Sequence, residues 1–212
     1  PINYRLTADD FAYIIAHSGS RVVCAHSHYL EMVDSIRDRI PGVVHFVALE
    51  GARDGWRDYE QLVAASDGRF ERPQIGERDL LTINYTSGTT ARPKGVMITH
   101  RNAHLNTVGT LLHVPMAANA GRYLWTLPMF HANGWTFPWT ITAVGGTHVC
   151  LRRVEPPRIF AELARERITM LCAAPTVLIG IANAPDEIRR GAPRGVRVFT
   201  AGAPPAAATI SR

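Results

Sequence analysis

The sequence predicts an α/β protein with two parallel-sheet lobes and helices on both faces. Short apolar runs of strand length alternate with amphipathic segments of helix length along most of the chain. This alternation is typical of parallel sheets covered by helices. The composition fits, because 212 residues with 46% hydrophobic and 19% charged side chains can form a sizeable core. A polar stretch over residues 50–79 predicts the boundary between a first lobe, 1–79, and a second lobe, 80–212.

The first lobe is expected to begin with a helix. Thr7-Ala8-Asp9-Asp10 is similar to a capping box, an apolar face follows at Phe11, and Gly19 ends the helix. The remaining elements of this lobe are expected to be a strand at 22–25, a helix at 29–40 and a strand at 43–49. After the polar stretch, a strand at 80–85 is expected to begin the second lobe.

The second lobe repeats the alternation of strands and helices. We expect strands at 123–127, 148–151, 169–173 and 196–200. We expect helices at 102–113, 136–144, 157–167 and 176–183. Because ligands of such sheets bind beyond the carboxyl ends of the strands, functional residues should follow these strands directly.

Several classes of protein are disfavoured by composition. No run approaches the roughly 20 apolar residues of a membrane-spanning helix, and the start, Pro1 to Arg5, lacks the features of a signal peptide. Cys24, Cys150 and Cys172 are expected to be buried, reduced thiols of a cytoplasmic protein. A net charge of +5 permits anionic partners, but the basic residues are not interleaved with aromatic ones. A solvated face is therefore favoured over a nucleic-acid groove.

The most informative segment runs from Tyr85 to Gly95 and reads Tyr-Thr-Ser-Gly-Thr-Thr-Ala-Arg-Pro-Lys-Gly. Its hydroxyl and backbone N–H groups can donate to phosphate oxygens, its glycines permit close approach, and Lys94 adds a positive charge. The segment is not a P-loop, because Lys94 precedes Gly95 and the run Val96–Thr99 is of β type, where a P-loop has a helix. The alternative without function is a surface turn rich in Ser, Thr and Gly.

Two further motifs follow predicted strands. Leu127–Trp135 contains a proline three residues before His131 and ends on Trp135. The alternatives for these two side chains are a hydrogen-bonded core histidine and a packed core tryptophan. The second motif is Thr200–Pro205, with the sequence Thr-Ala-Gly-Ala-Pro-Pro. By itself it has little weight, because Gly-Ala-Pro turns are common in loops.

The run from Tyr85 to Gly95 resembles the phosphate-binding signature of the adenylate-forming superfamily, which includes acyl-CoA synthetases, adenylation domains and luciferases. Leu127–Trp135 is similar to a second signature of that superfamily. Thr200–Pro205 resembles a third more loosely, since Ala201 stands where glycine is commoner. The resemblance covers essentially the whole chain. It implies part of the large N-terminal domain, without the C-terminal lid domain, so we expect that this polypeptide alone does not complete acyl-CoA formation.

The resemblance also implies the site. The residues expected to bind the nucleotide are Thr86, Ser87, Gly88, Thr89, Thr90, Lys94, Gly95, Gly202, Ala203 and Pro204. The residues expected to contact the acid are His131, Trp135 and Gly202. By the same resemblance His131 and Lys94 are the catalytic residues, and Thr90 is a ligand of Mg²⁺.

The implied activity is that of an AMP-forming fatty-acyl-CoA synthetase for medium or long chains, which is an acid–thiol ligase. Its partners would be the fatty acid, ATP with Mg²⁺, and coenzyme A, in the cytoplasm and without nucleic acid. Peripheral membrane contact and a homodimer stay open. Three alternatives also remain: a truncated module that binds ATP or acyl groups without turnover, an acyl-AMP ligase that loads a carrier protein, and a nucleic-acid-binding protein.

Overall fold

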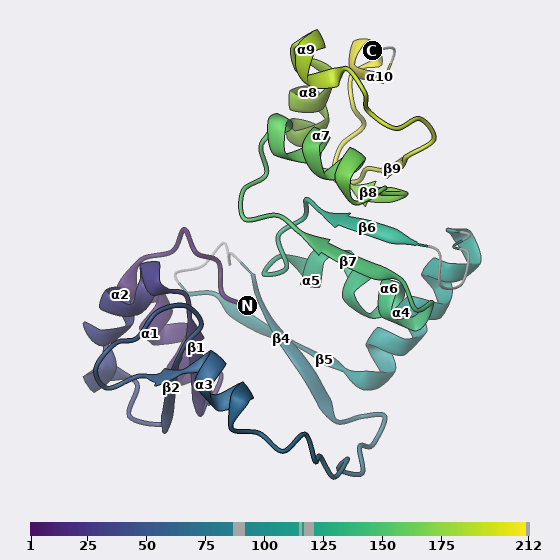
Figure 1. Ribbon diagram of the computed structural model, residues 1–212. Coiled ribbons are helices and arrows are strands. Elements are labelled where there is room, and N and C mark those ends of the chain that lie inside the picture. The colour runs from purple at the N-terminus through teal and green to yellow at the C-terminus, as the bar shows by residue number, and fades with distance from the viewer. Residues whose placement is uncertain (87–91, 115, 117–120, 211–212) are drawn as a thin grey trace. The chain divides into compact units, whose positions relative to one another are not determined.

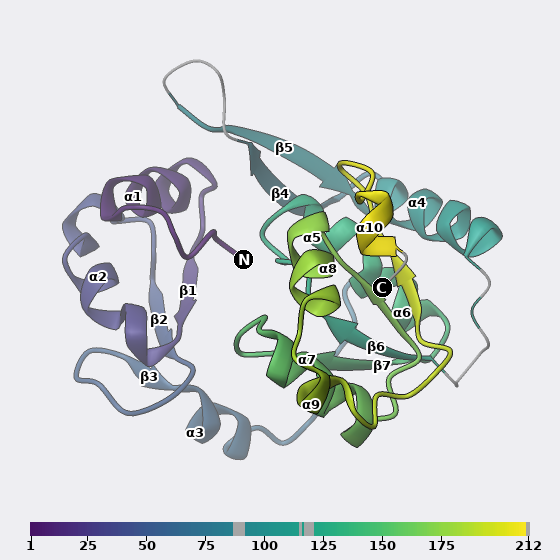
Figure 2. The same ribbon diagram turned by 90° about the horizontal axis from the view of Figure 1, so that it is seen from above.

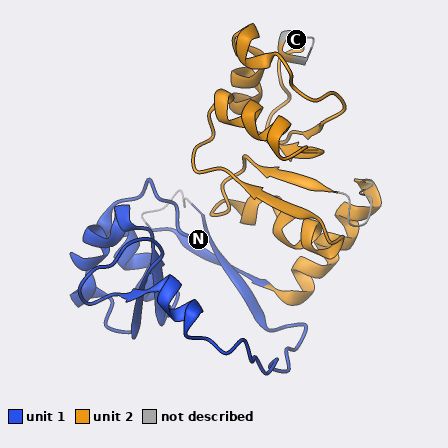
Figure 3. Cartoon of the chain, viewed as in Figure 1, with its two compact units in different colours: residues 1–98 blue, residues 99–212 orange. Residues whose placement is uncertain are grey.

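A computed structural model describes residues 1–86, 92–114, 116 and 121–210. Within these residues the chain forms two compact units, unit 1 (Pro1–Ile98) and unit 2 (Thr99–Arg212), which Figure 3 shows in different colours. The predicted α/β class, with parallel sheets and helices, is confirmed. The boundary lies after Ile98, whereas the sequence suggested residue 79, because the segment that follows the polar stretch packs against the first helix of unit 1.

Unit 1 is built on a parallel sheet with the strand order β1-β2-β3. Its strands are β1 (Val22–Ala25), β2 (His45–Ala48) and β3 (Arg57–Asp58). Helices α1 (Ala8–His17) and α2 (Leu30–Asp34) lie on the same side of this sheet (Figure 2). Side chains from both helices and from the covered face of the sheet form one apolar core, which includes Phe11, Ile15, Leu30, Val33 and Ala48.

The predicted start and end of α1 are confirmed. The Thr7 hydroxyl accepts a hydrogen bond from the Asp10 backbone N–H at 3.3 Å, and the Asp10 carboxylate accepts one from the Thr7 backbone N–H at 3.0 Å. This reciprocal capping box satisfies two N–H groups that a helix start otherwise leaves without partners. Gly19 follows the helix with a φ of 67°, a conformation that glycine adopts without steric cost.

The single helix predicted over 29–40 is wrong. The chain instead forms a short 3₁₀ helix, η1 (Ser27–Tyr29), then α2, then a second 3₁₀ helix, η2 (Arg37–Arg39). The backbone leaves helical geometry at Ile36, whose φ is −119°, and at Ile40, whose φ is −125°. Both isoleucines are almost completely buried. Because Val33, Ile36 and Ile40 have the spacing of one helix face, the apolar pattern of the sequence does not mark this break.

The polar stretch over 50–79 contains two elements that the sequence analysis missed, β3 and α3 (Tyr59–Ala64). β3 has only two residues, both polar, so no apolar alternation marks it. A signal for α3 was present, because the carboxylate of Asp58 caps the helix by accepting a hydrogen bond from the Gln61 N–H at 2.9 Å.

Strands β4 (Leu80–Thr86) and β5 (Lys94–Thr99) form a sheet of their own rather than part of a parallel lobe. The strand predicted at 80–85 and the β-type run Val96–Thr99 are both confirmed. In Figure 1 the two strands lie side by side as a long ribbon. The segment that resembles a phosphate-binding loop joins them.

Unit 2 contains a parallel sheet with the order β7-β6-β8-β9 (Figure 1). Its strands are β6 (Arg122–Trp125), β7 (Thr147–Cys150), β8 (Met170–Cys172) and β9 (Arg197–Phe199), so all four predicted strands are confirmed. The central strands β6 and β8 are almost completely buried, whereas the edge strands β7 and β9 are largely exposed. The two inner strands therefore contribute most of the apolar side chains that pack the sheet between its helices.

Helices cover both faces of this sheet. They are α4 (His100–His113), α5 (Ala132–Trp135), α6 (Phe137–Ala143), α7 (Pro156–Arg165), α8 (Pro175–Ala182), α9 (Asp186–Arg189) and α10 (Ala207–Ile210). On one face Phe137 and Ile141 of α6 pack against Tyr123, and on the other face Ile159 of α7 packs against Leu124. The two neighbouring side chains of β6 point to opposite faces, as the pleat of a strand requires.

The expectation that all three cysteines are buried is wrong. Cys172 lies on the central strand β8 and is buried, but Cys24 and Cys150 are exposed. Cys24 is on the face of β1 away from the helices, and Cys150 ends the edge strand β7. An apolar run alone does not distinguish a central strand from an edge strand. Within the described part of the chain, no helix is long and apolar enough to span a bilayer.

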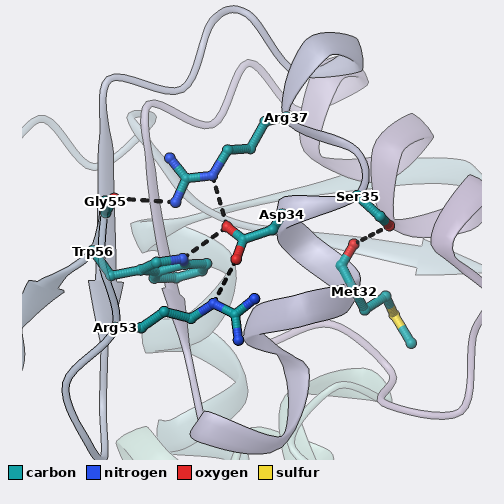
Figure 4. A network of polar contacts seen from close by, with 7 residues as sticks. All are labelled: Met32, Asp34, Ser35, Arg37, Arg53, Gly55 and Trp56. Atoms are coloured by element: carbon teal, nitrogen blue, oxygen red, sulfur yellow. Dashed lines mark hydrogen bonds and ion pairs between the residues drawn. The ribbon is translucent and has the colours of Figure 1, made fainter.

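A half-buried acid, Asp34, anchors the loop between β2 and β3 to α2 (Figure 4). The carboxylate of Asp34 accepts hydrogen bonds from Nε of Arg37 at 2.8 Å, Nε of Arg53 at 2.6 Å and Nε1 of Trp56 at 2.8 Å. The Arg37 guanidinium also lies over the ring of Phe46, 3.9 Å from its centroid. One neighbouring donor from η2 and two donors from the β2–β3 loop therefore converge on one carboxylate.

We predict that Asp34→Asn lowers the free energy of unfolding by about 1–3 kcal/mol near neutral pH. Burial raises the pKa of the Asp34 carboxyl, but the hydrogen bonds from Arg37, Trp56 and Arg53 outweigh it, and the pKa is lowered overall. A group with a lowered folded pKa stabilises the protein above its unfolded pKa, about 3.9, and loses this contribution as the pH falls through the folded value. The difference between the variant and the unsubstituted protein should therefore shrink below about pH 4.

Denaturant unfolding at a series of pH values measures this effect. Asp38→Asn is the matched control, because Asp38 is an exposed acid on the adjacent element η2. The assigned role of Asp34 would be contradicted if both variants lost the same free energy of unfolding. It would also be contradicted if the loss for Asp34→Asn did not change with pH.

Candidate functional site

The segment that resembles a phosphate-binding loop begins and ends on the ribbon of β4 and β5 in unit 1. Ser87, Gly88, Thr89 and Thr90 lie outside the described residues. Of the flanking residues, Thr86 is the last residue of β4 and Lys94 the first of β5, and both side chains are exposed. The hydroxyl group and the ammonium group at the two ends of the segment are thus accessible to an anion.

Gly95 has a packing role that the sequence did not reveal. A Cβ at this position would lie 2.8 Å from Cγ2 of Ile83 and 3.4 Å from Cζ of Tyr85. Both residues belong to the paired strand β4. A glycine at this position thus lets the β4 side chains lie directly over the β5 backbone, whatever its part in ligand binding.

Helix α1 holds both ends of the same segment. The Tyr13 hydroxyl donates a hydrogen bond to the Pro93 carbonyl oxygen at 3.0 Å, and Nδ1 of His17 lies 2.8 Å from the Tyr85 hydroxyl. The rings of Tyr13 and His17 stack, with centroids 5.1 Å apart. The Arg92 guanidinium lies 5.3 Å from the centroid of the Tyr13 ring. Burial raises the pKa of the Tyr85 phenol, with a smaller contribution from Tyr13, so it stays protonated at neutral pH.

Tyr13 and His17 are not predicted from the sequence as parts of this arrangement. A signal was available, because residues four apart lie on one face of a helix. What the pattern could not show is the element that this face meets. That element, the ribbon of β4 and β5, lies about 70 to 80 residues further along the chain.

In unit 2 the other two motifs gather at the carboxyl ends of the parallel strands. The chain passes from β6 outward to β7 and then back to β8 on the other side of β6, so the connections diverge between β6 and β8. Such a switch point is where ligands of α/β sheets bind. The buried hydroxyl of Thr126, which follows β6, donates a hydrogen bond to the carbonyl of Cys172 at the end of β8. This bond joins the two strand ends.

The Leu127–Trp135 motif follows β6 and ends in a strained turn. His131 precedes α5 and is exposed. The next five residues, 132–136, which include all of α5, have positive φ values between 45° and 63°, so α5 is a left-handed turn and not a regular α-helix. For a residue other than glycine the left-handed conformation costs roughly 1–2 kcal/mol, so the turn persists only because its surroundings hold it. Strain of this kind is concentrated at functional sites.

Trp135 lies in this turn and is half-buried. Its side chain packs against the apolar cluster that includes Tyr123, Trp125 and Phe137. His131, in contrast, is not in this cluster, so the alternative of a core histidine is wrong for that residue. The turn therefore places an exposed imidazole and a half-buried indole within four residues of each other.

The Thr200–Pro205 motif follows β9, the neighbour of β8. Gly202 has a φ of 92°, which favours glycine, and Gly202, Ala203 and Pro204 are exposed. The strand order thus places this motif and His131 at the same, carboxyl-terminal edge of one sheet. Within the described part of the chain, no group of three or more His, Cys, Asp and Glu side chains could hold a metal ion.

The pattern of these motifs agrees with comparisons to known proteins. The family model described as AMP-binding enzyme matches residues 1–212. This chain belongs to the AMP-binding enzyme family. The predicted resemblance to adenylate-forming enzymes is thereby confirmed, and so is the prediction of an acid–thiol ligase family.

Similar proteins of this AMP-binding family include enzymes named for short acids. A 4-hydroxybutyrate–CoA ligase of Metallosphaera sedula is 41% identical over 99% of this chain and 40% of its own length. The peroxisomal acetate/butyrate–CoA ligase AAE7 of Arabidopsis thaliana is 37% identical over 96% of this chain and 39% of its own length. The chain thus spans about two-fifths of these relatives.

A solved structure supports the fold. The N-terminal domain of FACL13 from Mycobacterium tuberculosis matches with a TM-score of 0.87 and 27% identity, covering 100% of this chain and 52% of that one. The AMP-binding chain therefore has the fold of part of an N-terminal domain, as the sequence predicted.

We predict that Gly95→Ala lowers the free energy of unfolding by about 1–3 kcal/mol, because the added methyl group overlaps Ile83 across the ribbon. Chemical denaturation of the variant measures the loss. Gly42→Ala is the matched control: a Cβ there meets nothing within 4 Å, and its φ is not positive. Equal stability of the two variants would show that β4 and β5 do not approach as closely as the structure indicates.

Proposed function

We propose that this chain is part of an AMP-forming acid–CoA ligase of the length of its relatives. In the first step the carboxylate attacks the α-phosphorus of ATP, forming an acyl-adenylate and releasing pyrophosphate. In the second step the thiol of coenzyme A attacks the acyl carbon, forming the thioester and releasing AMP. The observation that carries the proposal is the run from Tyr85 to Gly95, with Thr86 and Lys94 exposed at its ends, in a chain that matches the family throughout.

The first step requires two anions to meet, so positive charge and fixed hydrogen-bond donors are needed. We assign the triphosphate to the hydroxyl and N–H groups of residues 86–90 and to the ammonium group of Lys94. Lys94 is the only lysine in the 212-residue sequence, and its exposure at the start of β5 supports this assignment. The ends of the segment are held by α1, which reduces the ordering that phosphate binding would require.

Magnesium would supply charge neutralisation between phosphate oxygens. We propose Thr90 as its ligand from this chain. An ion that keeps several waters and binds mainly through phosphates needs few protein ligands. The absence of an acidic cluster among the described residues is compatible with such a site.

We assign the acid to the carboxyl edge of the sheet in unit 2. His131 would orient the carboxylate and Trp135 would close the acyl site, because the strained turn presents both residues there. The exposed backbone of Gly202, Ala203 and Pro204 would flank the adenine and the acid, next to the end of β8. Coenzyme A is proposed as the acyl acceptor because the relatives are named as CoA ligases; a carrier protein is the alternative.

The sequence motif and the names of the relatives favour acids of different length. By its resemblance to fatty-acyl members of the superfamily, the segment Phe130–Trp135 predicts a fatty acid of medium or long chain. The relatives named for 4-hydroxybutyrate, acetate and butyrate instead favour a short acid. We propose the short acids first, because these relatives are 41% and 37% identical to this chain. A cytoplasmic location and the absence of nucleic acid among the partners remain part of the proposal.

We predict that Lys94→Ala in the full-length protein lowers kcat/KM for ATP by about 10- to 100-fold, because a charged donor to phosphate is lost. Acid-dependent release of pyrophosphate is the measurement. Lys94→Arg should retain more activity, and Arg21→Ala, which removes an exposed cation elsewhere in unit 1, should have little effect. Amine-specific labelling, read at Lys94 by mass spectrometry of the peptide that contains it, is a second measurement, and ATP should slow this labelling. Unchanged turnover by Lys94→Ala would refute the assignment.

We predict that a series of straight-chain acids from two to sixteen carbons gives the highest kcat/KM at four carbons or fewer, with 4-hydroxybutyrate included in the series. Thioester formation in the full-length protein is the measurement. A maximum at eight or more carbons would instead support the fatty-acid class. Pyrophosphate release that depends on an acid but produces no thioester with coenzyme A would support a carrier-protein acceptor.

A further inference from the structure

The strained turn of unit 2 is supported at two points. At its end, the hydroxyl of Thr136 lies within hydrogen-bonding distance of both Oδ1 of Asn106 on α4 and the Trp135 carbonyl oxygen. In its middle, Gly134 lies against the side chain of Trp125 on β6: a Cβ on Gly134 would be 2.4 Å from Cζ3 and 3.1 Å from Cη2 of that indole. The positive φ of Gly134, 60°, adds a second reason for glycine. The indole of Trp125 thus forms the surface on which the turn rests.

The position of Trp125 is itself fixed by a short chain of hydrogen bonds. Its Nε1–H donates to Nδ1 of His148 at 3.0 Å, and Nε2 of His148 lies 3.1 Å from the Thr142 hydroxyl. That hydroxyl has one proton, which it donates to the Pro138 carbonyl at 2.6 Å. The hydroxyl must therefore accept from His148, which places the imidazole proton on Nε2 and leaves Nδ1 as the acceptor for Trp125.

The arrangement is rigid for further reasons. The Trp125 side chain is 4% exposed and its ring makes an edge contact with Tyr123, with centroids 4.9 Å apart. The His148 ring stacks on Trp125 at 5.9 Å. Burial lowers the pKa of His148, so the neutral imidazole that accepts from Trp125 is the form present at neutral pH.

We propose that Trp125 is a positioning residue that determines recognition of the acid. Through its contact with Gly134, Trp125 fixes the turn that presents His131 and Trp135 at the carboxyl edge of the sheet. This inference rests on the proposed function, in which that turn binds the acid. It predicts that changes at Trp125 alter the use of the acid and leave the use of ATP nearly unchanged. The phosphate-binding segment belongs to unit 1, and the Thr200–Pro205 motif follows β9, whereas Trp125 contacts the turn that follows β6.

A double-mutant cycle in the full-length protein tests the contact. Gly134→Ala places a methyl group against the indole and should raise KM for the acid about tenfold or more. Trp125→Phe removes Cζ3, Cη2 and the indole N–H, and should raise KM for the acid about threefold. In the double variant the methyl group gains space, so KM for the acid should fall at least threefold below that of Gly134→Ala alone. In all three variants KM for ATP should stay within about twofold of its unsubstituted value.

The controls make the same chemical changes at sites outside the contact. Gly109→Ala lies on α4, where an added Cβ meets nothing within 4 Å, and Trp139→Phe alters a half-buried tryptophan on α6. Thermal unfolding of every variant separates a general loss of folded protein from a change in the acid site. The preference among acids of different length should shift for Trp125→Phe and not for Trp139→Phe.

The outcomes distinguish this inference from the proposed function. Two results would overturn the role of Trp125 and leave the proposed function intact, provided that the unsubstituted protein turns over normally. In one, KM for the acid and KM for ATP change together in the variants. In the other, the effects of Gly134→Ala and Trp125→Phe on KM for the acid are additive. If the unsubstituted protein releases no pyrophosphate with any acid, the proposed function fails and this inference fails with it.

Discussion

The pairing of β6 with β8 is the constraint on which unit 2 depends. Both strands are buried on both faces, so their successive side chains must fill two separate apolar clusters, one under α6 and one under α7 and α8. Beyond the paired residues, Thr126 joins the strand ends by its bond to the Cys172 carbonyl. The loop that follows β6 therefore begins at a residue, Thr126, whose position is fixed. This fixed beginning helps the loop to hold the strained conformation of residues 132–136.

In unit 1, too, a packed element fixes the ends of a loop, but here that element is the helix α1. The segment between β4 and β5 carries the groups assigned to phosphate, and its ends are fixed by Tyr13 and His17 of α1. That helix is in turn held by its capping box and by its apolar face in the core. Loops that bind ligands are commonly positioned by a rigid scaffold in this way. In each unit, the candidate binding groups lie on a loop that directly adjoins a well-packed helix or strand.

The division of chemistry between the units follows from these supports. A segment rich in hydroxyl and N–H donors, with one lysine, is suited to an anion and needs little apolar surface. A turn that rests on the indole of Trp125 and presents Trp135 is suited to a partly apolar acid. An adenylate-forming reaction needs both kinds of site, because it joins a carboxylate to a nucleotide phosphate. The local geometry is thus compatible with the class of reaction proposed for the full-length protein.

The sequence by itself determined the fold class, most strands and helices, and all three motifs, because these depend on local periodicity and on unusual runs such as Tyr85–Gly95. It failed where burial decided the outcome. The exposure of Cys24 depends on which face of its strand meets the core. The helix breaks at Ile36 although its apolar spacing is that of a continuous helix. Only the tertiary structure decided that Gly95 faces Ile83 and that Trp125 supports Gly134, since these contacts join residues that no local pattern relates.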